Sequence, residues 1–176
     1  MAAVPSMTHM LRFNGCESLN KVSLLIFGVN SINKKKLSQT ITKLSTNFDV
    51  KIQISDYLFP EKDKNPFQFN VDYICFVADI SQKESLKRVT DSMKFIDAKY
   101  FLSRACLVVH IPNGCRENFS IELESINHLA KNYNLMTIFG NLEKGADKVS
   151  TQLLRLVEIA CGFKKNGKNS LLLSLV

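Results

Sequence analysis

The sequence has no tryptophan, and glycine and proline are scarce, with 7 and 4 residues respectively in a chain of 176. It also has no apolar run that approaches the length of about 18 residues required by a membrane-spanning helix. The N-terminal segment contains Pro5, Thr8 and His9 where a secretory signal needs a continuous apolar stretch. We therefore expect a chain without a membrane anchor, a secretory signal or a low-complexity segment.

The five cysteines lack the spacing of a metal site or a disulfide framework. Their number is odd, and no Cys-x-x-Cys pair occurs among Cys16, Cys75, Cys106, Cys115 and Cys161. Cys75 and Cys106 lie within apolar, strand-like runs, which favours buried thiols. Reduced thiols are typical of proteins of the cytosol or the nucleus. We accordingly predict no metal site and a reducing compartment.

The residues that are present suit a folded domain with a basic surface. Hydrophobic residues make up 45% of the chain and charged residues 22%, which is close to the average for soluble globular proteins. The formal net charge is +7. Such an excess favours acidic partners, such as nucleic acid or an acidic protein face, without specifying a fold.

Strand-like and helix-like segments alternate along the chain. Apolar or alternating stretches predict strands at residues 22–27, 50–55, 72–78, 105–111 and 135–139. Amphipathic spacing predicts helices at residues 31–44, 119–133 and 146–161, with Gly162 ending the last, and a further helix opened by a capping box of Ser81 and Glu84. This order predicts an α/β fold of three layers, a mostly parallel sheet with helices on both faces.

The extent of these strand and helix patterns divides the chain into three parts. Residues 1–20 show no periodicity and are predicted to be a flexible N-terminal arm. Residues 21–162 form the α/β domain, in which residues 56–70 are predicted to be a long surface loop. Residues 163–176 are predicted to be a basic linker followed by a leucine-rich C-terminal tail.

The end of the first strand resembles a degenerate phosphate-binding loop. A P-loop has the pattern Gly-x-x-x-x-Gly-Lys-Ser/Thr, whose glycines permit tight turns, whose lysine binds phosphate and whose hydroxyl ligates Mg²⁺. Gly28 and Lys34 fit this pattern, but Asn33 replaces the second glycine and Lys35 replaces the metal ligand. We favour a helix start with a solvated run of lysines at residues 34–36 over a working phosphate site.

The other strand ends also lack the residues that read a guanine nucleotide. Asp56 begins an Asp-x-x-Gly pattern, but Phe59 stands in place of its glycine, so that Asp56 is interpreted as an ordinary loop carboxylate. The guanine-binding motif Asn-Lys-x-Asp is absent after the strand predicted at residues 105–111. Gly140, Asn141 and Leu142 stand where a small GTPase has Ser-Ala-Lys. Four defects at four strand ends predict a degenerate nucleotide site, with no cofactor and no enzymatic activity.

Two further kinds of chemistry are less favoured. His110 and Cys115 have the chemistry of a base and a nucleophile, but a histidine at a strand end beside a loop cysteine is the simpler interpretation. The basic segments at residues 34–36 and 164–168 have the charge to contact DNA phosphates. No aromatic residues interleave them, so a solvated surface is favoured over DNA binding.

The C-terminal tail carries four leucines beyond the predicted end of the domain, which are Leu171, Leu172, Leu173 and Leu175. Apolar residues that follow a completed core must cover another surface or be covered themselves. They either pack back on the domain or enter a groove of a partner. We predict these leucines as partner-binding residues, with the neighbouring lysines supplying electrostatic attraction.

Several spaced blocks of the sequence resemble the centromere protein M family. They are FIDAKYFL at residues 95–102, ACL at 105–107, HLAKNY at 128–133, LLRLVEIACG at 153–162 and LLSL at 172–175. The similarity covers roughly residues 20–176, and the N-terminal arm and the loop after Asp56 match poorly.

This resemblance implies a small-GTPase-like fold that neither binds nor hydrolyses GTP. It also implies a nuclear protein of the inner kinetochore, which assembles with centromere proteins H, I and K and contacts chiefly the helical-repeat protein centromere protein I. Two alternatives remain from the residues themselves: an atypical GTPase that uses Lys34, and a basic DNA-binding adaptor.

Overall fold

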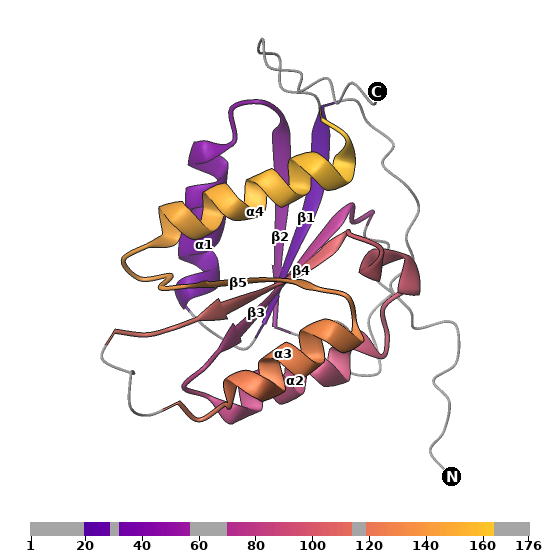
Figure 1. Ribbon diagram of the computed structural model, residues 1–176. Coiled ribbons are helices and arrows are strands. Elements are labelled where there is room, and N and C mark those ends of the chain that lie inside the picture. Colours follow the sequence, from indigo (N-terminus) through magenta and orange to yellow (C-terminus); the bar gives the residue numbers. More distant parts are fainter. Residues whose placement is uncertain (1–19, 29–31, 57–69, 114–118, 164–176) are drawn as a thin grey trace, which may run out of the picture.

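The computed structural model describes residues 20–28, 32–56, 70–113 and 119–163 (Figure 1). Its strands form one five-stranded sheet of order β2-β1-β3-β4-β5 in which all neighbours are parallel. The strands are β1 (Lys21–Gly28), β2 (Asp49–Ser55), β3 (Tyr73–Asp79), β4 (Ala105–His110) and β5 (Met136–Gly140). The helices are α1 (Ile32–Leu44), α2 (Lys83–Met93), the 3-10 turn η2 (Ala98–Phe101), α3 (Leu123–Asn132) and α4 (Ala146–Cys161).

The helices cover the sheet on both faces, with α1 and α4 on one side and α2 and α3 on the other (Figure 1). The central strands β1, β3 and β4 are buried along almost their whole length, as expected for near-continuous apolar runs in a parallel sheet. Side chains that alternate along β1 divide between the layers: Leu24 and Ile26 face α1 and α4, while Leu25 and Phe27 face α2 and α3.

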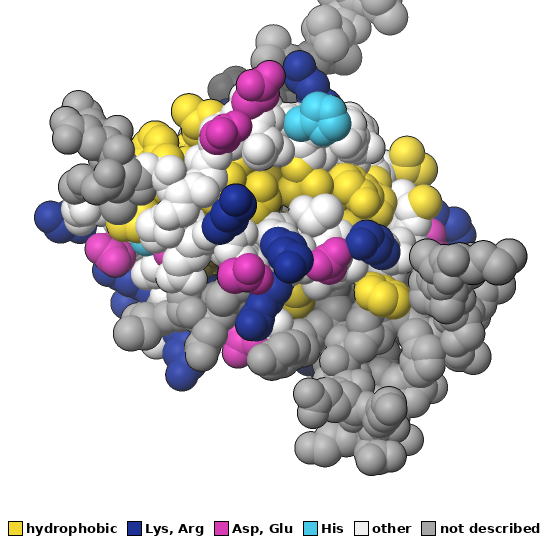
Figure 2. All heavy atoms as spheres, turned by 90° about the horizontal axis from the view of Figure 1, so that it is seen from below, with side chains coloured by type: hydrophobic (Ala, Val, Ile, Leu, Met, Phe, Trp, Pro, Cys, Tyr) yellow, Lys and Arg dark blue, Asp and Glu magenta, His cyan; other side chains and the backbone are white. Residues whose placement is uncertain are grey.

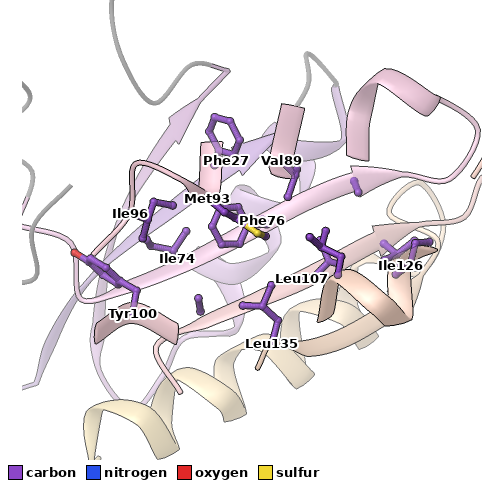
Figure 3. Close-up of a cluster of buried hydrophobic side chains, with 14 of the residues drawn as sticks. Phe27, Ile74, Phe76, Val89, Met93, Ile96, Tyr100, Leu107, Ile126 and Leu135 are labelled. Carbon is purple, nitrogen blue, oxygen red and sulfur yellow. The ribbon is translucent and has the colours of Figure 1, made fainter. Parts of the chain in front are cut away.

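The core on the α2 and α3 side is dense and partly aromatic. Figure 3 shows side chains of β1, β3 and β4 meeting those of α2 and α3, among them Phe27, Phe76, Met93, Leu107 and Ile126. Phe27 and Phe76 pack edge to face with their ring centroids 6.1 Å apart. This layer fixes α2 and α3 rigidly on the sheet.

The predicted α/β fold of three layers is confirmed, and its arrangement is consistent with that of a small GTPase. The predicted edge position of the second strand is also confirmed, as is the end of α4, where Gly162 adopts a φ of 73° at the C-cap. The burial predicted for Cys75 and Cys106 is confirmed as well. The arm, most of the surface loop and the tail lie outside the described residues, so the domain boundaries remain predictions.

Two local predictions were wrong. No capping box forms, because the Asp79 carboxylate accepts hydrogen bonds from the amide and the hydroxyl of Ser81, and Gln82 becomes the N-cap of α2 without a side-chain bond. The helix α3 begins at Leu123 and not at Phe119, since the amides of residues 120 and 121 both donate to the Ile80 carbonyl and hold this segment against the end of β3.

Within the described part of the chain, no helix has the length and apolarity needed to cross a bilayer.

The close approach of β3 to the end of β1 requires a glycine at position 28. A Cβ atom on Gly28 would lie 2.3 Å from the Val77 carbonyl oxygen, which is shorter than any real contact. We expect Gly28→Ala to lower the free energy of unfolding by about 1–3 kcal/mol, measured by urea denaturation, since the strands must separate. Gly145→Ala, with its nearest contact at 3.1 Å, is a milder control. Unchanged stability of Gly28→Ala would contradict this packing.

Candidate functional site

The candidate site lies where β1 and β2 end, at the edge of the sheet where doubly wound folds bind their ligands. The two strands are neighbours, and Phe27 of β1 pairs in register with Ser55 of β2. Residues 27–28 and 55–56 therefore reach this edge together. The helix α1 begins above them and places Lys34 in its first turn.

Lys34 is folded into the protein, and its side chain is only 2% exposed. Its ammonium group donates hydrogen bonds to the Gly28 carbonyl at 2.5 Å, to the Ser55 carbonyl at 3.3 Å and to the Asp56 carboxylate. Asp56 balances the charge of Lys34 and remains 42% exposed. The pair thus ties the start of α1 to the ends of β1 and β2.

This arrangement corrects two sequence-based interpretations. Lys34 does not belong to a solvated lysine run, although Lys35 and Lys36 are exposed as expected. Asp56 is not an ordinary loop carboxylate, because it is the counter-ion of a buried cation. The physical reason is that an ammonium group can be buried only when its charge is paired and its protons are bonded.

The enclosed lysine does not fit the role of a phosphate ligand. An ammonium group has three protons to donate, and three protein oxygens already accept from Lys34. The adjacent Asp56 carboxylate would also repel a phosphate. At the position of the metal ligand, Lys35 presents an exposed cation in place of a hydroxyl. Asn33 is half-buried, and Gly28 serves the packing of the sheet.

The ends of β4 and β5 are closed by contacts within the protein. His110 is 2% exposed, and its Nδ1 accepts a hydrogen bond of 3.1 Å from the Leu142 amide. The ring proton therefore lies on Nε2, which is 4.0 Å from a Glu143 carboxylate oxygen. Leu142 is fully buried in the core on the α1 and α4 side. These contacts explain His110 as a structural residue, while its suggested partner Cys115 lies outside the described residues.

Asn141 stabilises the turn between β5 and α4. Its side-chain oxygen accepts hydrogen bonds of 2.8 Å from the amides of Glu143 and Lys144. The exposed Lys36 reaches the same turn from α1 and donates to the Glu143 carbonyl. The polar side chains of His110, Asn141 and Lys36 thus bond to the backbone of this turn. Among the residues that the structure describes, no cluster of three or more His, Cys, Asp or Glu side chains could hold a metal ion.

The family assignment follows from comparison with known proteins. A model of the centromere protein M family matches residues 7–176. The chain belongs to the centromere protein M family. Its relatives include centromere protein M of Xenopus laevis, 22% identical over 85% of this chain and 84% of the relative, and that of Homo sapiens, 24% identical over 82% and 79%. Centromere protein M of Bos taurus is 26% identical over 82% of this chain and 79% of the relative.

The structure brings some of the predicted site residues of this family member together and leaves others undescribed. Gly28 ends β1, and Asn33, Lys34 and Lys35 lie in the first turn of α1. Leu171, Leu172, Leu173 and Leu175 lie outside the described residues. The pairing of Lys34 with Asp56 was missed, although the signal existed: carboxyl ends of adjacent parallel strands meet at one edge.

The enclosed ion pair makes a prediction about stability. Asp56→Ala leaves a buried ammonium group without its counter-charge, so we expect it to lower the free energy of unfolding by about 2–3 kcal/mol. Lys34→Met retains an apolar stem and removes the charge, so its loss should be smaller, about 1 kcal/mol. Urea denaturation measures both, and exposed Lys35→Met is the control.

The double variant Lys34→Met with Asp56→Ala tests whether the two residues interact. It should be no less stable than Asp56→Ala alone, because no buried charge remains unpaired. If the stability losses of the two single variants simply add in the double variant, the two residues are not coupled.

Proposed function

We propose that this chain is a non-catalytic pseudo-GTPase that acts as an interaction subunit of the inner kinetochore. Its relatives carry the name centromere protein M, and the fold is consistent with a small GTPase. The observation that carries the proposal is the enclosure of Lys34, the one residue of the P-loop pattern with phosphate-binding chemistry. A domain whose lysine at this position is bonded within the protein can still use its outer surfaces for protein contacts.

The proposed partners are centromere protein I, as the chief contact, and centromere proteins H and K. The proposed contact residues are the four leucines of the tail, Leu171, Leu172, Leu173 and Leu175. The described residues just before the tail support an apolar surface there. Phe163 stacks on Phe48 with ring centroids 4.7 Å apart, and Ile159 on the last turns of α4 is 70% exposed.

The enclosure of Lys34 weakens both alternatives. An atypical GTPase would need that ammonium group for phosphate, and it is bonded to three protein oxygens. A DNA-binding adaptor would need the lysines of residues 34–36 to contact phosphates. Lys34 is buried, and Lys36 donates a hydrogen bond to the Glu143 carbonyl. A protein-binding role agrees better with these contacts.

Titration with guanine nucleotide tests the pseudo-GTPase proposal. We expect calorimetry with GTP and Mg²⁺ to show no saturable heat, and the melting temperature to remain unchanged, because the Lys34 ammonium group already donates to three protein oxygens. A small GTPase of known nucleotide affinity serves as the positive control. Saturable binding in the micromolar range, or measurable release of phosphate, would refute the proposal.

The tail is tested by placing a charge in it. We expect Leu172→Glu to weaken binding to centromere protein I by at least tenfold, which is about 1.4 kcal/mol, since a buried unpaired carboxylate is costly. Asn169→Glu adds the same charge outside the leucines and is the matched control. Binding is measured by calorimetry after co-purification. Equal affinity of Leu172→Glu and the unmodified protein would exclude the tail from the interface.

A further inference from the structure

The helices α2 and α3 form a shallow groove of about 560 Å³ on the outer side of the molecule. Leu86 and Thr90 line it from α2, and Ser125, Leu129 and Tyr133 line it from α3 and its C-cap. Figure 2 looks onto this face and shows a band of hydrophobic side chains with charged side chains on both sides of it. The groove lies on the opposite face of the sheet from α4, which leads into the tail.

The groove is preformed, because the same two helices are anchored in the core by their inner sides. Val89 and Met93 of α2 and Ile126 of α3 are at most 1% exposed. Leu86 and Tyr133 are partly buried and pack against this core cluster. The lining side chains therefore have defined positions before any partner binds, which reduces the entropy lost on binding.

The charge of the lining is opposite to that of the whole chain. Among the lining residues that the structure describes, Glu122 and Glu124 are the only Asp, Glu, Lys or Arg residues, whereas the formal net charge of the chain is +7. His128, also in the lining, lies with its Nδ1 3.0 Å from the side-chain amide nitrogen of Asn132. This local acidity favours a cationic occupant and disfavours nucleic acid.

Lys94, the residue that follows α2, is paired with an acidic side chain of the same helix. Lys94 follows α2, and its ammonium group lies 2.8 Å from the Asp91 carboxylate. This hydrogen bond raises the pKa of Lys94 and lowers that of Asp91. Their charges therefore largely cancel within the pair.

We propose that the α2/α3 groove docks an amphipathic helix of a partner protein, with the apolar side of that helix in the groove and its Lys or Arg side chains against Glu122 and Glu124. A helix suits the site because its residues at spacings of three and four would lie along the valley between two helices. The proposal rests on the proposed function, since it assigns a second contact surface to the same interaction subunit.

The first experiment fills the groove. Ser125 is exposed on α3 and lines the groove, so Ser125→Trp should obstruct it without disturbing the core. Asn127→Trp places the same bulk on an exposed position of α3 outside the lining and is the matched control. With the purified assembly of centromere proteins H, I and K as the probe, we expect Ser125→Trp to weaken binding by about tenfold or more and Asn127→Trp to have little effect.

The second experiment reverses the charge of the lining. We expect the double variant Glu122→Lys with Glu124→Lys to weaken binding and to remove most of its dependence on salt. Glu84→Lys with Asp147→Lys is the control, because both residues are exposed acids in the first turn of a helix and lie outside the lining. This control changes the net charge by the same amount as the groove variant does. Melting temperatures verify that every variant is folded.

The outcomes separate this inference from the proposed function. If the unmodified protein fails to bind the assembly, the proposed function fails and the groove loses its partner with it. If it binds and both groove variants bind equally well, the function stands and the docking site is refuted. Increased hydrogen exchange in α3 after removal of residues 164–176 would instead identify the tail of the same chain as the occupant. A dimer abolished by Ser125→Trp would identify a second copy, and either result would overturn the proposal.

Discussion

The enclosure of one ammonium group explains much of what distinguishes this domain. Lys34 occupies the position that a phosphate-binding lysine would hold, but its protons are directed to the end of β1 and the end of β2. Because a buried charge is tolerated only with partners, the ion pair with Asp56 holds the first turn of α1 against the ends of β1 and β2, while Leu37 and Ile41 pack the rest of the helix on the sheet. The contacts that position the helix are the same contacts that remove the lysine from ligand binding.

The described ends of β4 and β5 are also closed by contacts within the protein. The side chains of His110 and Asn141 accept hydrogen bonds from backbone amides of the turn that follows β5, and Leu142 is fully buried in that turn. A catalytic edge needs donors and acceptors that lack protein partners, so that a ligand can take their place. At this edge the described polar groups contribute to the stability of the domain.

The sheet and its layers could be predicted from the sequence because hydrophobic periodicity is a local signal. The runs at residues 22–27 and 105–111 indicated buried strands, and α4 was predicted over the residues that it occupies. The ion pair could not be found by considering each strand end alone, since Lys34 and Asp56 are 22 residues apart and meet only through the order of the sheet. The capping box at Ser81 failed for a similar reason, because Asp79 at the end of β3 competed for the same donors.

The state of the Lys34 ammonium group can be observed directly by ¹⁵N-detected NMR of lysine side chains. An enclosed, bonded ammonium group predicts a slowly exchanging Lys34 signal that is absent from Lys34→Met and unchanged by an excess of GTP with Mg²⁺. A Lys34 signal that exchanges as rapidly as those of the exposed Lys35 and Lys36, or that shifts saturably with nucleotide, would contradict a closed site.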